Sequence, residues 1–287
     1  MTVQASLIDE IEKQAVDRQL PDGSPYRSLS LNAVLELSRR YEMAGRKVEI
    51  NALKIGIIPE RYARNLRMMS PEDQVRLLES RVSVVGLGGL GGSVTEILAR
   101  IGIGRLTLYD ADHFEDSNLN RQFLSQLDSI GSPKAEAAAT RVDRINPSVE
   151  VRAAKAFIGA ENSESLLAGS DAVVDCLDNI QTRFIIEEAA RKIGCPLVSA
   201  AVAGASGYIT TVFPSDPGLE TVFGPRDAAT EKGSEASLGC LPQAVTFLAT
   251  LECSEVIKII LGRGVLLRRQ LLTADLMDNT FEIFNLQ

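Results

Sequence analysis

The sequence predicts an α/β protein in which a mostly parallel sheet carries helices on both faces, preceded by a small N-terminal helical appendage. Two observations support this fold class. From Arg81 onward, short apolar segments alternate with segments of helical spacing, as in parallel sheets whose strands are joined by helices. Residues 1–58 show helical spacing alone. We therefore divide the chain into an appendage over residues 1–58 and an α/β domain over residues 59–287.

The size and composition of the chain suit this division. Its 287 residues, 45% of them hydrophobic, are enough for one large core and a smaller unit. No segment approaches the roughly eighteen uninterrupted apolar residues of a membrane span, and the polar, acidic N-terminus does not resemble a signal peptide. The net charge of −8 argues against a broad basic surface for nucleic acid.

The four cysteines lie far apart and form no CxxC pair. Their spacing argues against a disulfide framework and against a cysteine-rich zinc site. We therefore expect a reducing, cytoplasmic setting and no zinc. These cysteines are Cys176, Cys195, Cys240 and Cys253.

Three helices are expected in the appendage. The first follows from the helical spacing of apolar residues between Leu7 and Ala15, and it ends before the turn-forming residues at 21–25. The second covers about 31–43 and the third about 48–54, each stopping just before a glycine. Nothing in these helices carries chemistry. A role in docking or in supporting a dimer is a hypothesis, and the alternative is that they have no specific role.

The elements of the α/β domain follow from short apolar runs and the residues that separate them. We expect a closing β-hairpin over 270–276 and 280–285, and a buried helix over 241–261 whose polar residues argue against a membrane span. The other strands are expected at 82–85, 106–109, 149–152, 172–176, 197–201 and 208–213, with helices ending at 101 and covering 134–145 and 180–193.

A glycine-rich loop joins the first strand to its helix. Gly86, Gly88 and Gly91 fit the pattern GxGxxG, in a run that also contains Gly89. In a Rossmann-like unit these glycines permit a tight turn, the approach of backbone to phosphate and the packing of helix on strand, while the helix N-terminus offers free N–H groups to the phosphates. Asp110 ends the second strand, where an acid can bind ribose hydroxyls. This fingerprint alone is compatible with NAD as well as ATP.

Charged and amide side chains favour ATP. They occur in four motifs after strand ends: Asp110–Asp112, Ser117–Gln122, Gly131–Lys134 and Asp175–Asn179. A hydride-transfer site needs a nicotinamide pocket and often an acid–base residue, and the single histidine, His113, lies in a loop near the nucleotide edge. Arginine, lysine and aspartate instead suit a triphosphate with Mg²⁺, because nucleotidyl transfer depends mainly on positioning and charge neutralisation. A carboxylate substrate is ionised at neutral pH and needs no general base.

From about Pro59 to its C-terminus, the chain resembles the ThiF/MoeB/HesA family, the bacterial relatives of ubiquitin-activating enzymes. The matching motifs occur in the family's order: RYAR at 61–64, GLGGLGG at 86–92, DAD at 110–112, SNLNRQ at 117–122, GSPK at 131–134 and DCLDN at 175–179. The resemblance implies a homodimeric adenylyltransferase that uses ATP and Mg²⁺ on the C-terminal carboxylate of a ubiquitin-like sulfur-carrier protein. The carrier would be ThiS- or MoaD-like and end in Gly-Gly. The resemblance leaves the pathway open, whether thiamine, molybdopterin or another.

The resemblance also implies roles for single residues. Asp110 would bind the ribose, Asp178 would hold Mg²⁺ beside the α-phosphate, and Arg64 would reach across a homodimer into the partner's site. Asn118, Arg121 and Lys134 would contact the phosphates. The catalytic set is then Arg64, Arg121, Lys134 and Asp178, and the nucleotide-binding set is Gly86, Gly88, Gly89, Gly91, Asp110, Asp112, Asn118, Arg121 and Lys134. For Asp112, a purely local role in a turn is an equal alternative.

The chain departs from the family at its cysteines. Many relatives carry CxxC pairs for structural zinc and a cysteine that links covalently to the carrier, whereas residues 214–237 here contain no cysteine. Ser234 or a near neighbour takes the place of the linking cysteine, and Cys240 lies a few residues beyond. We expect Cys240 to be a buried structural cysteine, with a reactive thiol as the alternative. The other functions still open are an ATP-dependent tRNA-modifying relative, an NAD-dependent oxidoreductase and an inactive dimeric scaffold.

Overall fold

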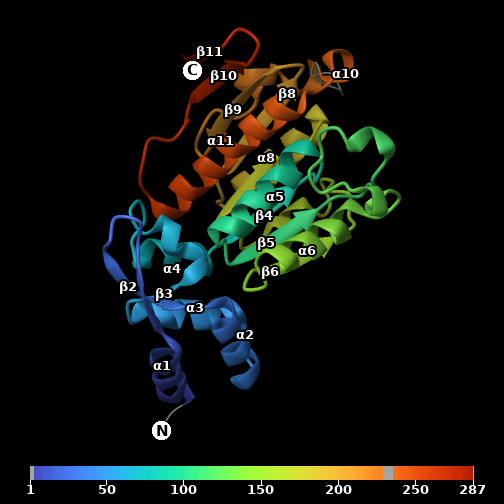
Figure 1. Ribbon diagram of the computed structural model, residues 1–287. Helices are drawn as coiled ribbons and strands as arrows, with labels where there is room; N and C mark the ends of the chain where they lie inside the picture. The colour runs from blue at the N-terminus through green and yellow to red at the C-terminus, as the bar shows by residue number, and fades with distance from the viewer. Residues whose placement is uncertain (1–2, 229–234, 287) are drawn as a thin grey trace.

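A computed structural model describes residues 3–228 and 235–286 of the chain. An eight-stranded sheet with helices on both faces forms the main body of the molecule (Figure 1). A smaller unit, made from the N-terminal residues up to Pro59, packs against one end of this body. The arrangement confirms the predicted α/β fold class.

The large sheet has the strand order β11-β10-β9-β8-β7-β4-β5-β6. The strands from β6 to β8 run parallel, and β9, β10 and β11 extend the sheet as antiparallel strands. Every one of the eight strands overlaps a range expected from the sequence. Their bounds are β4 Arg81–Val85, β5 Arg105–Tyr109, β6 Glu150–Ala154, β7 Ala172–Asp175, β8 Leu197–Ala203, β9 Ser206–Val212, β10 Gln270–Asp275 and β11 Thr280–Asn285.

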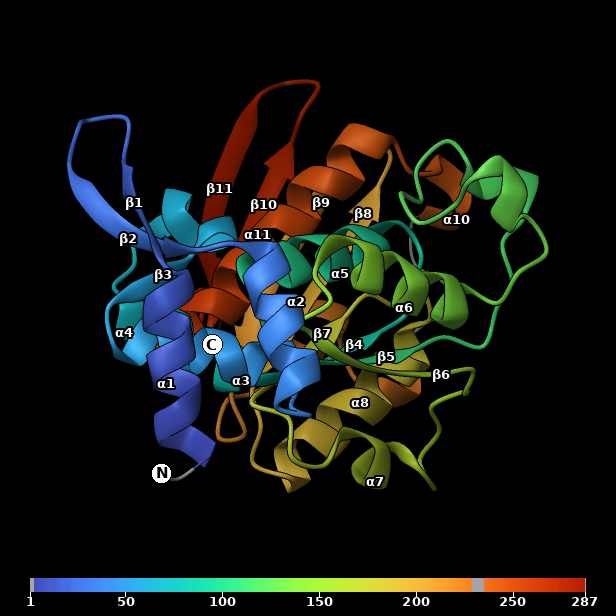
Figure 2. The same ribbon diagram turned by 60° about the horizontal axis from the view of Figure 1, so that its bottom comes forward.

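Helices cover both faces of this sheet (Figure 2). On one face lie α5 (Gly89–Ile101), α6 (Lys134–Ile145) and α11 (Pro242–Leu261), and on the other lie α7 (Ser163–Leu167) and α8 (Ile180–Lys192). The strands bury residues on both faces: Val174 packs in the core beneath α5 and α11, whereas its neighbour Val173 packs in the core beneath α8. In the described part of the chain, no helix, α11 included, is long and apolar enough to cross a membrane.

The loops that leave the carboxyl ends of β4, β5 and β7 share one edge of the sheet. The longest follows β5 and contains two short 3₁₀ helices, η2 (Asp116–Asn118) and η3 (Leu127–Ser129), before α6 begins. It projects from the body as the green segment of Figure 1. In open α/β sheets, ligands bind at this edge, so the fold itself indicates where to look for a site.

The N-terminal unit contains the three expected helices, α1 (Val3–Gln14), α2 (Leu31–Arg40) and α3 (Gly45–Lys54). It also contains a three-stranded sheet that the sequence analysis missed, formed by β1 (Val16–Gln19), β2 (Pro25–Leu29) and β3 (Ile57–Pro59). The expected break at 21–25 is the turn between β1 and β2, and β2 pairs with β3 in parallel. β3 lies across the position where we divided the chain.

A short segment leads from the N-terminal unit into the large sheet. It consists of the 3₁₀ helix η1 (Glu60–Asn65) and α4 (Pro71–Glu79). Ser70 caps α4 by accepting from the Asp73 N–H at 3.2 Å, and the Asp73 carboxylate accepts from the Ser70 N–H at 3.0 Å. This reciprocal cap fixes the chain where it enters the main body.

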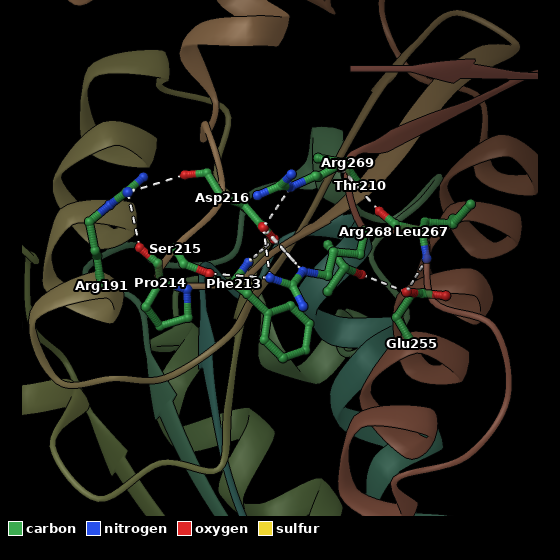
Figure 3. A network of polar contacts seen from close by, with 11 residues as sticks. Arg191, Thr210, Phe213, Pro214, Ser215, Asp216, Glu255, Leu267, Arg268 and Arg269 are labelled. Atoms are coloured by element: carbon green, nitrogen blue, oxygen red, sulfur yellow. Dashed lines mark hydrogen bonds and ion pairs between the residues drawn. The ribbon is translucent and has the colours of Figure 1, made fainter. Parts of the chain in front are cut away.

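After β9, the chain turns and returns to the carboxyl edge of the sheet. Asp216 anchors the turn, because its carboxylate accepts from Arg268 at 2.8 Å and from Arg269 at 3.0 Å, while Arg191 donates to the carbonyls of Pro214 and Asp216 (Figure 3). The returning segment contains α9 (Glu220–Phe223), η4 (Arg226–Ala228) and α10 (Glu235–Leu238). The ion pairs therefore tie this segment to the start of β10.

Candidate nucleotide-binding site

A cavity of about 420 Å³ lies at the carboxyl edge of the parallel strands. This volume falls within the range of roughly 300–1,000 Å³ common for small-molecule sites. Most of the predicted site residues line the cavity: Gly86, Gly88, Gly89, Asp110, Asp112, Arg121, Lys134 and Asp178. The structure thus brings together residues that are up to about ninety positions apart in the sequence.

The glycine loop forms the cavity wall next to the start of α5. Gly86 has a φ of +87°, and a Cβ there would lie 2.7 Å from the carbonyl oxygen of Cys176. Gly91 does not line the cavity; it packs α5 on the loop, where a Cβ would lie 1.8 Å from the Gly86 carbonyl oxygen. No side chain caps the first turn of α5, whose N-cap residue is Gly88. The N–H groups of this turn are therefore available to an anion.

Asp110 connects the glycine loop to the loop after β5. One carboxylate oxygen accepts from the Leu87 N–H at 2.6 Å and the other accepts from the Asp112 N–H at 2.8 Å. Asp112 in turn forms an ion pair with Lys134, the first residue of α6, at 3.2 Å. The Lys134 side chain is 9% exposed and that of Asp112 is 72% exposed. Asp112 therefore holds a largely buried cation at the cavity wall.

The loop after β5 also holds Arg121 and Asn118. Arg121 lines the cavity, and its guanidinium donates to the Ser117 carbonyl at 2.9 Å. Asn118 is buried and does not line the cavity; its side-chain oxygen accepts from the Glu115 N–H at 3.0 Å. In this structure, Asn118 therefore shapes the loop that presents Arg121.

Asp178 lies on a short loop that is fixed on both sides. The Leu177 N–H donates to Asp175 at 3.1 Å, and the Leu177 carbonyl accepts from Arg183. On the other side, Asn179 caps α8 by accepting from the Thr182 N–H at 2.9 Å. The Asp178 side chain is exposed at the cavity and makes no hydrogen bond or ion pair with any residue that the structure describes.

Beneath this loop lies a buried polar cluster that the sequence analysis missed. Asp175 forms an ion pair with Arg183 at 2.8 Å and accepts from Ser199 at 2.6 Å. Burial raises the pKa of Asp175 against the opposing effect of Arg183. Burial also raises the pKa of Glu252, on α11, well above its usual value, with the Asp175 charge acting in the same direction. The DCLDN motif contained Asp175, but nothing local indicated its partner in α8.

Arg64 lies away from the cavity of its own chain. It is an exposed residue of η1, and its side chain makes no hydrogen bond or ion pair within the described part of the chain. Its neighbour Tyr62 packs against Gly102, at the C-terminal end of α5, whereas the cavity lies at the N-terminal end. Because α5 has 13 residues and a helix rises about 1.5 Å per residue, roughly 20 Å separate the two ends.

The cysteines differ from expectation at one position. Cys240 is only partly buried and lines the cavity, so the prediction of a buried cysteine is wrong there. The reason is that the returning segment brings Cys240 beside β8, where its sulfur lies 3.5 Å from the Val202 carbonyl oxygen. Cys176, by contrast, is buried. Ser234 lies outside the described residues. Within 3–228 and 235–286, no three His, Cys, Asp or Glu residues form a cluster suited to a metal.

The glycine loop, the uncapped helix start, the acid that follows β5 and the nearby cations together define a nucleotide-binding α/β protein. Comparison with known proteins specifies it further. Residues 62–287 match the model of the ThiF family. The SAMP-activating enzyme E1 of Haloferax volcanii is 40% identical over 231 residues, covering 78% of this chain and 83% of the relative. The sulfur carrier protein adenylyltransferase of Thermus thermophilus is 35% identical over 235 residues, covering 77% of this chain and 85% of that relative.

Solved structures agree on the fold. The crystal structure of E. coli MccB with ATP has a TM-score of 0.69 and 21% identity, and the similarity covers 99% of this chain and 87% of that one. SeMet PaaA has a TM-score of 0.66 at 22% identity, covering 79% of this chain and 82% of that one. The chain belongs to the ThiF family, and it is an adenylyltransferase.

Proposed function

We propose that this enzyme uses ATP to adenylate the C-terminal carboxylate of a small ubiquitin-like sulfur-carrier protein, ThiS- or MoaD-like, that ends in Gly-Gly. The observation that carries the proposal is the convergence of the glycine loop with Asp110, Arg121, Lys134 and Asp178 on one cavity. The names of the relatives from Haloferax volcanii and Thermus thermophilus support the same reaction class and a carrier-type substrate.

The cavity supports one orientation of ATP. Asp110 would bind the ribose hydroxyls, since it directly follows β5 and lies beside the glycine loop. The phosphates would then lie against the uncapped start of α5, within the positive field of Arg121 and Lys134. Asp112 would contribute indirectly, by holding Lys134 in place through their ion pair.

A magnesium ion would bind at Asp178. Mg²⁺ is usually held by one or two carboxylates together with substrate phosphates and water, so a single free carboxylate at the cavity fits it. When bound, Mg²⁺ would neutralise phosphate charge. The protein's own part is to keep the Asp178 carboxylate in place, through the fixed peptide of Leu177 and the capped start of α8.

The reaction requires no proton transfer to begin. An oxygen of the carrier's C-terminal carboxylate attacks the α-phosphorus, the bond from that phosphorus to the bridging oxygen breaks, and pyrophosphate leaves with the bonding electrons. Because the carboxylate is already ionised, the protein's task is to position it and to stabilise developing negative charge. Arg121 and Lys134 would supply the positive charge that does so, and no thiol is needed for this step.

Arg64 would complete the site from the partner subunit of a homodimer. Its exposed side chain belongs to η1, whose Tyr62 packs at the C-terminal end of α5, whereas its own cavity lies at the N-terminal end of that helix, which is roughly 20 Å long. Positive charge near the leaving phosphates would accelerate the reaction. The proposal therefore includes a dimer in which each cavity receives an arginine from the other chain.

Carrier-dependent exchange of pyrophosphate into ATP tests this function. Asp178→Ala should lower the exchange rate on the order of 10²-fold or more, as the loss of a preorganised charged group does. Asp278→Ala, which removes an exposed carboxylate in the turn between β10 and β11, is the matched control and should leave the rate unchanged. Equal rates for the two variants would exclude the assignment of Asp178.

A further inference from the structure

The N-terminal unit is in direct contact with the turn that carries Arg64. Glu49, on α3, is fully buried, and its carboxylate lies between two residues of η1. One oxygen forms an ion pair with the Arg61 Nε at 3.5 Å, and the other accepts from the Tyr62 hydroxyl at 3.3 Å. Burying a carboxylate is unfavourable unless such partners compensate, so this contact depends on the polar groups of η1.

A second contact joins the N-terminal sheet to the same turn. Glu60, the first residue of η1, accepts hydrogen bonds from the Tyr26 hydroxyl at 3.1 Å and from the Ser28 hydroxyl, both on β2. β2 also pairs with β3, which continues directly into η1. The turn is therefore held by α3 and by β2.

The large domain holds the opposite side of the turn. Arg61 donates to the Ile145 carbonyl at 3.1 Å, and the Tyr62 hydroxyl accepts from the Asn146 amide at 3.1 Å. Arg61 and Tyr62 thus each connect Glu49 to the end of α6. Arg64, two residues beyond Tyr62, makes no side-chain hydrogen bond or ion pair with the described residues, although its charge acts on the nearby Tyr26 hydroxyl. The position of its guanidinium therefore depends mainly on the backbone of η1.

We propose that Glu49 is a positioning residue for the partner's active site. It fixes the backbone of η1 so that the Arg64 guanidinium is correctly placed relative to the phosphates in the partner's cavity. This inference rests on the proposed function, in which Arg64 acts in trans. It gives the N-terminal unit a specific task, which is to support the arginine-bearing turn. Glu60 supports the same turn from the side of β2.

Mixed dimers can test this proposal because they separate the two contributions of each chain. In a dimer of an Asp178→Ala chain and an Arg64→Ala chain, one intact site remains: the cavity of the Arg64→Ala chain with the arginine of the Asp178→Ala chain. Such dimers can be purified with two different affinity tags. Glu49→Gln, which keeps the size of the side chain, is then added to one chain or to the other, and pyrophosphate exchange is measured with MgATP and a carrier ending in Gly-Gly.

Placed on the chain that donates Arg64, Glu49→Gln should lower kcat by about ten-fold or more, with the KM for ATP within about two-fold, because displacing a catalytic group by about 1 Å costs up to roughly 10²-fold. Placed on the chain that supplies the cavity, it should leave kcat within about two-fold. If Glu49 only stabilised its own chain, Glu49→Gln would lower kcat equally in the two mixed dimers. Equal losses, or no loss on either chain, overturn the proposal.

Two further arms keep the test decisive. If the Glu49→Gln chain does not fold, Glu60→Gln replaces it, because Glu60 is exposed and its loss should be tolerated by the fold. The same dependence on the donating chain is expected, and its absence overturns the inference. If the mixed dimer without any change at Glu49 shows no exchange, although subunit mixing is confirmed, then the trans role of Arg64 itself is wrong and the role of Glu49 falls with it.

Discussion

Replacing Gly91 by alanine should destabilise the protein, and the clash that the new Cβ would make indicates by how much. The new Cβ would lie 1.8 Å from the Gly86 carbonyl oxygen, where contacts under 3.0 Å essentially never occur, so one of them must move by more than 1 Å. The Gly86 backbone is not free to move, since its N–H donates to the Tyr109 carbonyl at 2.9 Å. We expect the free energy of unfolding to fall by about 3 kcal/mol or more.

The assay is thermal unfolding of Gly91→Ala beside its neighbour Gly92→Ala. At roughly 2–4 °C per kcal/mol for a chain of this size, Gly91→Ala should lower Tm by roughly 6–12 °C. At Gly92, a Cβ meets the flexible Leu124 side chain at 3.2 Å, and alanine gains up to about 1 kcal/mol over glycine inside a helix. Gly92→Ala should therefore stay within about 2 °C of the parent. Equal Tm values for the two variants would refute the steric argument.

Two other predictions concern a thiol and a buried acid. Cys240→Ala should leave carrier-dependent pyrophosphate exchange within a few-fold of the parent, because adenylation uses no thiol; a folded variant that exchanges pyrophosphate but no longer supports sulfur transfer would make Cys240 the carrier's attachment point. Burial, opposed by Arg61, raises the pKa of Glu49 from 4.5 to about 7, with Tyr62 as its other titratable neighbour. The stability from this raised pKa is complete below pH 4.5 and disappears as pH rises through 7. The free energy of unfolding of the parent should therefore fall by about 2.5 kcal/mol more than that of Glu49→Gln between pH 5 and 8, measured by thermal unfolding. If the stability of the two proteins changed in parallel with pH, the raised pKa of Glu49 would be contradicted.

The large sheet could be predicted from the sequence because its signals are local. Buried parallel strands are short apolar runs: β4 is such a run followed by Gly86, and β7 is such a run ending in Asp175. In the N-terminal unit, β3 is apolar but only three residues long, and β1 lacked that signal altogether. β1 has the sequence VDRQ and is exposed at all four positions, so neither an apolar run nor an alternation marked it.

Much of the candidate site could be anticipated for a related reason, since its motifs follow strand ends that a parallel sheet brings to one edge. The contacts that hold these motifs in place could not be anticipated from the sequence. The pairing of Asp175 with Arg183, and that of Glu49 with Arg61 and Tyr62, depend on how elements pack across the fold. The same is true of Cys240, whose exposure depends on the path of the returning segment beside β8.

The origin of one oxygen atom tests the central claim most directly. The carrier is prepared with ¹⁸O in its C-terminal carboxylate, incubated with the enzyme, Mg²⁺ and unlabelled ATP, and the acyl adenylate is then cleaved by a thiol in ordinary water. If the carboxylate oxygen attacks the α-phosphorus, the P–O bond formed in that step stays with AMP, and mass spectrometry finds one ¹⁸O atom in the released AMP. AMP that contains no ¹⁸O, although the carrier has been consumed, would contradict adenylation of the carboxylate.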